Sequence, residues 1–324
     1  MKNPQVTVLM PVYNGEKYLK EAIGSILNQT FKNFEFLIIN DGSTDKSVKI
    51  IESYNDNRIK LIHNSQNFKI IKTLNRGIGL AKGKYLARMD CDDISLPGRL
   101  EKQFHYLENH PEVGVCGTAF KVIDDNGRDV SVVKFPKTSA VIQWLLFFSN
   151  PLAHPTVMMN TSLVKKIGGY RPEALHCEDY DLWFRLTESS KIINLEEVLL
   201  CLRKHNKNIS ALFFKDQQDH VAEISQKIIS AQLKENMPLS DIRQVIFKEN
   251  RSLDQTINTY RIIYKLFQSY IKSKILSKEE LRLIKKDVAS RIYALTRLHG
   301  ISLKIWPLYV AVLKFDPTFP LRLI

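Results

Sequence analysis

Three aspartates stand within four residues at the end of an apolar stretch, in the run Arg88-Met89-Asp90-Cys91-Asp92-Asp93. Their negative charges repel one another, so a cation or a polar ligand is needed to hold them together. Hard divalent cations such as Mg²⁺ and Mn²⁺ take oxygen ligands and readily bridge a carboxylate to a diphosphate. The Asp-x-Asp spacing therefore predicts a diphosphate and metal site. Taken alone, the run also fits an acidic turn that caps a helix predicted from Pro97.

Polar residues also follow two earlier predicted strands. Pro11-Val12-Tyr13-Asn14-Gly15 comes after the first strand, and Asn40-Asp41-Gly42-Ser43-Thr44-Asp45 comes after the second. Ligands of open α/β sheets bind beyond the carboxyl ends of the strands. We therefore expect these two clusters and the three aspartates to contribute to one ligand site.

The elements that position these clusters alternate between strands and helices over the first 90 residues. Apolar, β-branched runs predict four buried parallel strands, at residues 6–11, 34–40, 60–63 and 84–90. Amphipathic segments predict helices between them, at residues 16–29, 43–54 and 70–81, and the second of these is predicted to be capped by Ser43, Thr44 and Asp45. This order is typical of a sheet covered by helices.

The pattern changes after Asp90. We expect helices at residues 97–109 and 140–148, and strands near residues 113–123, 130–135 and 191–203. From about Asp216 onward Ile, Leu and Tyr recur at helical spacing, with breaks at Pro238, Ser277 and Pro307. The sequence thus predicts an α/β domain over residues 1–210 and a helical region over residues 211–324.

The start of the chain, its apolar runs and its cysteines predict the cellular compartment. No charged segment followed by an apolar core and a cleavage site opens the chain, and no apolar run reaches the roughly 18 to 20 residues that cross a bilayer. We therefore expect a cytoplasmic protein. Four scattered cysteines without a C-x-x-C pair favour reduced residues in or near the core over a zinc site or a disulfide; they are Cys91, Cys116, Cys177 and Cys201.

The formal net charge of +13 is concentrated in the helical region. Residues 211–324 hold 19 Lys and Arg against 11 Asp and Glu, a net charge of +8, which leaves +5 for the first 210 residues. Near the end of the chain Trp306, Tyr309 and Phe315 alternate with basic residues. This composition suits an anionic membrane surface, such as the inner face of the cell membrane. Packing on the α/β domain or formation of a homo-oligomer is the alternative.

Four blocks of the sequence, taken together, resemble glycosyltransferase family two. They cover residues 11–15, 40–45, 87–93 and 178–183 and stand in the family's order. The resemblance implies a GT-A fold, a Rossmann-like α/β domain with one nucleotide-diphospho-sugar site, and inversion at the anomeric carbon. The implied donor is a UDP-sugar, with a dTDP-sugar left open. The expected acceptor is a glycan or a lipid-linked saccharide in bacterial surface polysaccharide assembly, and the transferred group is a hexosyl or N-acetylhexosaminyl group.

The resemblance also assigns residues to the donor. Asp41 would accept a hydrogen bond from uracil N3–H, although an Asx turn is an alternative role for it. The pocket for the nucleoside would be lined by Pro11, Val12 and Tyr13. Lys69 would reach the uracil or a phosphate, or else remain solvated; here the sequence departs from many relatives, which carry a glycine in the stretch Asn67-Phe68-Lys69.

The metal set implied by the resemblance includes two aspartates and a histidine. Asp90 would lie near the ribose and the metal, Asp92 would ligate the metal, and Asp93 would orient the loop or meet the sugar. His205, in the basic segment at residues 203–210, would complete the ligand set or contact the diphosphate. A neutral imidazole suits Mn²⁺ better than Mg²⁺, and either ion is the expected cofactor.

The resemblance places the general base in the fourth block. The resemblance selects Asp179 as the catalytic base and places Glu178 in the acceptor site. The alternative is that Glu178, Asp179 and Asp181 only stabilise a helix N-terminus through its dipole. His154 lies in another segment similar to the family. It would either face the acceptor side or be a packed loop histidine, and the sequence fits both roles about equally.

Other classes of protein fit the sequence less well. A dinucleotide-dependent oxidoreductase needs G-x-G-x-x-G after its first strand, and Tyr13-Asn14-Gly15-Glu16 has one glycine. An RNA- or membrane-binding protein on an inactive glycosyltransferase-like fold would explain the charge. However, the tail has no recognisable nucleic-acid module, so no nucleic-acid partner is expected.

Overall fold

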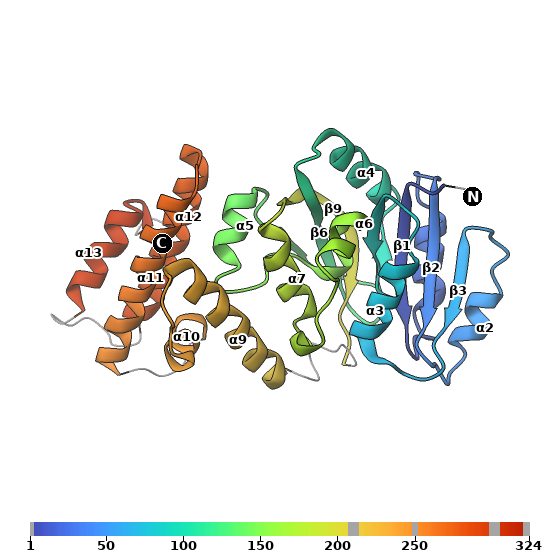
Figure 1. Cartoon of the computed structure of the whole chain (residues 1–324), viewed down its shortest axis with the longest axis horizontal. Helices are drawn as coiled ribbons and strands as arrows, with labels where there is room; N and C mark the ends of the chain where they lie inside the picture. The colour runs from blue at the N-terminus through green and yellow to red at the C-terminus, as the bar shows by residue number, and fades with distance from the viewer. Residues whose placement is uncertain (1–2, 207–213, 248–251, 298–304, 320–324) are drawn as a thin grey trace. The chain divides into compact units, whose positions relative to one another are not determined.

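The computed structural model describes residues 3–206, 214–247, 252–297 and 305–319 and divides into two compact units (Figure 1). The first unit comprises Met1–Ser139 and Asn150–Gln217, and the second comprises Ala140–Ser149 and Gln218–Ile324. The predicted boundary between residues 210 and 211 lies outside the described residues. The segment Ala140–Ser149 leaves the first unit and joins the helices that follow much later in the chain.

A mixed sheet forms the centre of the first unit. Its strands are β1 (Val6–Val12), β2 (Phe34–Asn40), β3 (Ile59–His63), β4 (Tyr85–Arg88), β5 (Ile94–Ser95), β6 (Val113–Ile123), β7 (Asp129–Val133), β8 (Met158–Asn160) and β9 (Lys191–Arg203). Among the described residues the order is β3-β2-β1-β4-β8-β6-β9-β5, and β7 pairs with β6. Figure 1 shows β1, β2 and β3 side by side.

The first four strands are parallel, as predicted, and end at one edge of the sheet. Val12 pairs with Asn40, and Asn40 pairs with His63, so β1, β2 and β3 end level with one another. β4 pairs with the other side of β1 and ends at Arg88, opposite Leu9. The polar clusters that follow β1, β2 and β4 therefore share this edge.

The prediction that β3 is buried was wrong. All seven residues of β2 are buried, whereas every residue of β3 is half-buried or exposed. β3 stands at the end of the sheet and pairs with β2. An edge position depends on strand order, which the local run of residues does not encode.

Helices cover both faces of the parallel strands. Val8 and Met10 share a buried core with Ala22 of α1 (Leu19–Leu27). On the other face, a Cβ atom on Gly77 of α3 (Lys69–Leu80) would lie 2.3 Å from Leu9 Cδ1, so glycine lets this helix approach the strand closely. Alternate strand residues face opposite sides, which is why one strand serves both layers. The other α-helices described in this unit are α2 (Ser47–Glu52), α4 (Arg99–Asn109), α6 (Thr161–Lys166) and α7 (Glu178–Thr187).

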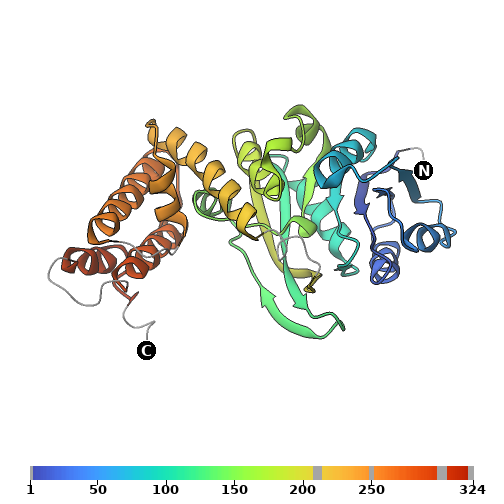
Figure 2. The same cartoon turned by 90° about the horizontal axis from the view of Figure 1, so that it is seen from below.

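A hairpin of β6 and β7 extends from the body of the first unit, drawn in green in Figure 2. β6 also runs parallel to β9, from Val113 beside Lys191 to Ile123 beside Arg203. The carboxyl end of β9 therefore lies next to the turn of the hairpin, where Gly127 adopts a φ of 82° that favours glycine.

The cysteines match the expectation from their spacing. All four are free; Cys116, Cys177 and Cys201 are buried, and Cys91 is half-buried.

The second unit is helical, as predicted. Its described helices are α5 (Ser139–Leu145), which begins one residue before it, α9 (Phe214–Leu233), which begins four residues before it, α10 (Leu239–Ile246), α11 (Leu253–Ser273), α12 (Lys278–Thr296) and α13 (Trp306–Phe315). Pro238 and Ser277 precede α10 and α12, and Pro307 lies in the first turn of α13, so the predicted breaks are confirmed. No helix among the described residues is long and apolar enough to cross a bilayer.

Trp144 explains why the short segment Ala140–Ser149 belongs to this unit. Its indole N–H donates a 2.7 Å hydrogen bond to Asp287 of α12, and its ring lies 5.6 Å from the ring of Tyr270 in α11. Trp144 is fully buried, and a buried indole N–H needs such an acceptor.

Candidate active site

The loops after β1 and β2 are joined by reciprocal hydrogen bonds. The Asn14 N–H donates to Ser43 Oγ at 3.0 Å, while Asn14 Oδ1 accepts the Thr44 N–H at 2.8 Å. The Glu16 N–H donates to Asp45 Oδ2 at 3.0 Å. Ser43 and Thr44 thus bind the neighbouring loop, and the predicted helix start at Ser43 was wrong: α2 begins at Ser47. Of the three predicted caps, Asp45 accepts the Ser47 N–H, at 2.9 Å.

Asp41 is fixed at the carboxyl end of β2. It is buried, and its Oδ1 accepts hydrogen bonds from Asn64 Nδ2 at 2.6 Å and from the Phe68 N–H at 2.9 Å. Its backbone N–H donates to the Val12 carbonyl at 2.8 Å. These contacts engage one carboxylate oxygen and hold the side chain in a single orientation.

The other residues predicted to surround the nucleoside differ in exposure. Pro11 is half-buried and Tyr13 is 49% exposed, whereas the Val12 side chain is fully buried in the core shared with α1. Lys69 begins α3 with a left-handed φ of 68°, and its side chain is exposed. Val12 therefore presents its backbone, and not its side chain, to this edge of the sheet.

The three aspartates after β4 form a compact cluster. One carboxylate oxygen from each of Asp90, Asp92 and Asp93 lies within 4.8 Å of the others. Burial and the charge of Asp90 raise the pKa of Asp92, although the hydrogen bond from His205 opposes this. Burial and both neighbouring charges raise the pKa of Asp93 well above its usual range. The cluster is thus electrostatically strained without a cation.

This cluster fits a hard divalent cation. Its donors are carboxylate oxygens, and in the part of the chain that the structure describes Oδ2 of Asp93 is buried without a hydrogen-bond donor. His205 Nε2 lies 2.9 Å from Asp92 Oδ2 and so adds a nitrogen at the same place. A cation among these groups would relieve the repulsion that raises the carboxyl pKa values. Residues 207–210 of the basic segment lie outside the described part of the chain.

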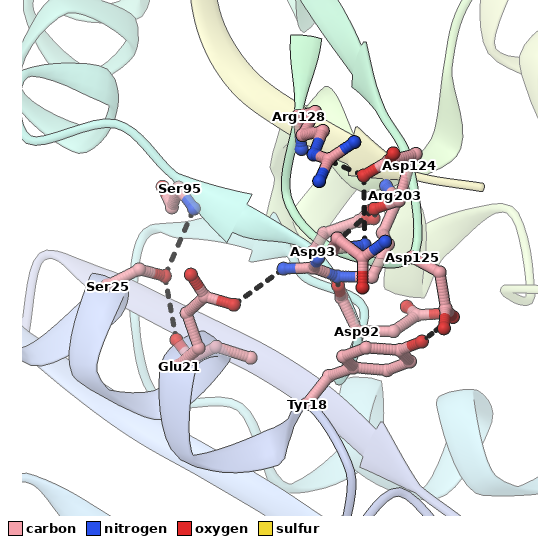
Figure 3. Close-up of polar contacts among 12 residues, drawn as sticks. Tyr18, Glu21, Ser25, Asp92, Asp93, Ser95, Asp124, Asp125, Arg128 and Arg203 are labelled. Carbon is pink, nitrogen blue, oxygen red and sulfur yellow. Dashed lines mark hydrogen bonds and ion pairs between the residues drawn. The ribbon is translucent and has the colours of Figure 1, made fainter. Parts of the chain in front are cut away.

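Arg203, which we did not single out from the sequence, holds the acidic loop in place (Figure 3). Its N–H donates to Asp93 Oδ1 at 2.8 Å and its Nε to the Asp92 carbonyl at 3.0 Å. Its Nη1 donates to the Asp124 carbonyl at 3.3 Å, and its Nη2 pairs with Glu21 at 2.5 Å. One buried side chain therefore connects the loop after β4, the β6–β7 turn and α1.

The fourth block places two carboxylates at the start of α7. Asp179 Oδ2 accepts a hydrogen bond from Asn150 Nδ2 at 2.7 Å, and its Oδ1 accepts the Tyr180 N–H at 2.7 Å. Burial raises the pKa of Asp179, although these hydrogen bonds and the charge of Arg88 act against the shift. Burial and the charge of Asp179 raise the pKa of Glu178 to about 7.

Arg88 supplies a buried positive charge that acts on both acidic groups. It is 5% exposed and forms an ion pair with Asp90, and its charge acts on the Asp179 carboxyl. His154 Nε2 lies 2.7 Å from the Tyr170 hydroxyl, and burial together with Arg88 lowers the pKa of His154 well below 6.5. His154 is therefore a neutral, packed residue, which fits the structural alternative. The sequence signal for Arg88 was an arginine inside an apolar run, two residues before the first aspartate.

Relatives of known sequence share most of this chain. The model of "Glycosyl transferase family 2" matches residues 7–168. An uncharacterized glycosyltransferase of Haemophilus influenzae is 30% identical over 312 residues, which cover 88% of this chain and 97% of the relative. The O-antigen biosynthesis glycosyltransferase WbnJ of Escherichia coli is 37% identical over 209 residues, which cover 63% of this chain and 81% of the relative.

Solved structures share the fold. S. aureus TarS 1-349, in complex with UDP-GlcNAc, matches with a TM-score of 0.57 and 18% identity, over 98% of this chain and 92% of TarS 1-349. The mannosyltransferase PcManGT from Pyrobaculum calidifontis, in complex with GDP-Man and Mn²⁺, matches with a TM-score of 0.53 and 16% identity, over 98% of this chain and 83% of PcManGT. The fold is thus that of GT-A glycosyltransferases, followed by a helical region. With the family model and the long relatives, this shows that the chain belongs to glycosyl transferase family 2.

Proposed function

We propose that this glycosyltransferase inverts the anomeric carbon and moves a hexosyl or N-acetylhexosaminyl group from a UDP-sugar to an acceptor hydroxyl, with Asp179 as the general base. The observation that carries the proposal is that one buried positive charge, Arg88, pairs with Asp90 and also acts on the Asp179 carboxyl. The cluster of Asp90, Asp92 and Asp93 supplies a site for a metal and diphosphate, and Glu178 and Asp179 supply a proton acceptor nearby.

On the donor side, Asp90, Asp92 and His205 would hold Mn²⁺ or Mg²⁺. A bound divalent cation would neutralise charge on the diphosphate as it leaves. Asp93 is held by the Arg203 N–H, which supports a role in orienting the loop. The GT-A neighbour in complex with GDP-Man and Mn²⁺ supports a metal in this class of site.

The nucleoside would lie at the ends of β1 and β2. Oδ1 of Asp41 is engaged by Asn64 and Phe68, which leaves Oδ2 to accept uracil N3–H. Tyr13 and Pro11 would contact the rings, Val12 would contribute backbone, and exposed Lys69 would approach a phosphate. Thymine presents the same N3–H, so Asp41 alone does not separate UDP from dTDP.

The transfer itself is a single displacement. The acceptor oxygen forms a bond to the anomeric carbon on the face opposite the diphosphate, while the bond from that carbon to the diphosphate oxygen breaks and the electron pair stays with the leaving diphosphate. The acceptor proton passes to the Asp179 carboxylate, and Asn150 fixes the orientation of that carboxylate. Glu178 would contact the acceptor.

The acceptor is proposed to be a glycan or a lipid-linked saccharide, which suits the relative named for O-antigen biosynthesis. The helical region would bind the anionic inner face of the cell membrane. α13 supports this, because Trp306, Val310 and Leu313 are 58%, 36% and 46% exposed at helical spacing, beside exposed Lys314. A second copy of the chain is the alternative occupant of this face.

A panel of nucleotide sugars tests the donor. Purified protein with Mn²⁺ should release UDP from one UDP-hexose or UDP-N-acetylhexosamine faster than from GDP- or CMP-sugars, and Asp92→Ala should abolish this release. Equal, Asp92-independent rates for every nucleotide would contradict the donor assignment. If NMR shows that the product keeps the anomeric configuration of the donor, inversion is contradicted.

A further inference from the structure

We propose that Tyr18 is a positioning residue that orients the His205 imidazole toward Asp92 and thereby sets the metal affinity of the acidic cluster. The inference rests on the proposed function, because it takes His205 as a member of the metal set. Tyr18 lies in neither the nucleotide blocks nor the acidic run, and it directly precedes α1.

The Tyr18 and His205 rings are stacked. Their centroids lie 5.2 Å apart with an interplanar angle of 20°, and His205 Nε2 lies 2.9 Å from Asp92 Oδ2. A hydrogen bond alone lets an imidazole rotate about the bond axis. A parallel aromatic neighbour fixes the plane of the ring, and with it the direction of the nitrogen lone pair.

Tyr18 is itself held from two directions (Figure 3). Its hydroxyl hydrogen-bonds to Asp125 in the β6–β7 turn, and Lys17 pairs with the same carboxylate. The Arg203 guanidinium carbon lies 4.6 Å from the centroid of the Tyr18 ring. A cation at this distance is attracted to the face of an aromatic ring.

The hairpin turn is ordered by its own contacts. Asp124 Oδ1 accepts the N–H groups of Asn126 at 2.9 Å and Arg128 at 2.8 Å, and the Asp124 carbonyl accepts from Arg203. The turn therefore holds Asp125 in place, Asp125 holds the Tyr18 hydroxyl, and the Tyr18 ring supports His205. Groups that orient a metal ligand in this way typically change metal affinity 10- to 100-fold when they are replaced.

Mn²⁺ binding to the full-length, metal-free protein tests the inference without any turnover. The variants are Tyr18→Leu, which removes the ring, Tyr18→Phe, which keeps the ring and removes the hydroxyl, and His205→Ala. We expect Tyr18→Leu to weaken Mn²⁺ binding by roughly 10- to 100-fold, and Tyr18→Phe to weaken it less. Circular dichroism and thermal melting without metal identify a variant that has lost its fold.

Three results separate the possibilities. Normal Mn²⁺ affinity in folded Tyr18→Leu, with weak binding in His205→Ala, would overturn the positioning role alone. Equal losses in Tyr18→Phe and Tyr18→Leu would also overturn it, because the ring would not be the group that matters. Normal affinity in His205→Ala would remove His205 from the metal set and overturn both the inference and that part of the proposed function. If Tyr18→Leu does not fold, Tyr18→Trp replaces it, because tryptophan keeps an aromatic ring. Binding of Mn²⁺ 10-fold weaker in Tyr18→Trp than in Tyr18→Phe would then contradict the stacking argument.

Discussion

Asn150 donates a 2.7 Å hydrogen bond from Nδ2 to Oδ2 of Asp179. The donor comes from the loop before β8, and the acceptor stands at the start of α7. This bond orients the carboxylate and stabilises its charged form against burial. It gives Asp179 a fixed direction and favours the charged carboxylate, and the proposed general base needs both.

The bond makes the pH profile of transfer depend on Asn150. Burial raises the pKa of Asp179, and the hydrogen bond from Asn150 lowers it. Transfer requires the ionised carboxylate, so the rate falls as pH drops through this pKa. Asn150→Ala should raise the pKa and shift the acidic limb of kcat/KM toward higher pH. Glu178 is coupled to Asp179, so the fitted value belongs to the pair. An acidic limb that stays in place in the folded variant would show that Asn150 does not tune the base.

The metal requirement is tested by UDP binding. Mn²⁺ or Mg²⁺ should tighten UDP binding, because a cation held by Asp90 and Asp92 would neutralise charge on the diphosphate. Asp92→Ala should abolish this tightening while thermal melting without metal stays near that of the parent protein. Calorimetry that finds equal UDP affinity with Mn²⁺ and with a chelator would rule out the metal site.

Asp181 serves as the matched control on the same helix. Asp181 Oδ2 accepts from Arg185 Nε at 2.8 Å, and Arg185 also donates to the carbonyls of Ile167 and Gly169. Asp181→Asn should therefore lower the free energy of unfolding by about 1 to 3 kcal/mol and leave turnover of the folded protein nearly unchanged. Denaturant unfolding and kinetics on the same preparation check this. A large loss of turnover without a loss of stability would place Asp181 in the chemistry.

The membrane surface proposed for α13 is tested with lipid vesicles. The full-length protein should co-sediment with anionic vesicles at low salt and not with neutral ones, and Trp306→Ser with Leu313→Ser should reduce binding. Salt should weaken the interaction, since charge contributes to it. If no vesicle binding occurs and light scattering detects a dimer that the same substitutions dissociate, the face is an oligomer contact.

The sequence predicted those features that depend on local patterns. The apolar run of β2 has the same bounds in the structure as in the prediction, and the acidic run does follow a strand at the shared edge. The buried state of β3 was mispredicted because burial depends on strand order. The start of α2 was mispredicted because Ser43 and Thr44 bond to a loop about 30 residues away.

The residues that hold the site and the second unit together could not be predicted from the sequence, for a similar reason. Arg203 contacts Asp92 and Asp93 across 110 residues of chain or more, so no local spacing reveals the contact. Trp144 joins the second unit through Asp287, at a separation of 143 residues. Periodicity identifies helices and strands, whereas these contacts depend on how the elements are placed in space.

Asp179→Asn is the most direct measurement of the central claim, because the substitution keeps the size of the side chain and removes its ability to take the proton. The account predicts a fall in transfer of roughly 10² to 10⁴, with UDP and Mn²⁺ affinities unchanged and with Asp181→Asn retaining turnover. An Asp179→Asn protein that transfers sugar at a near-normal rate would contradict the assignment of Asp179 as the general base.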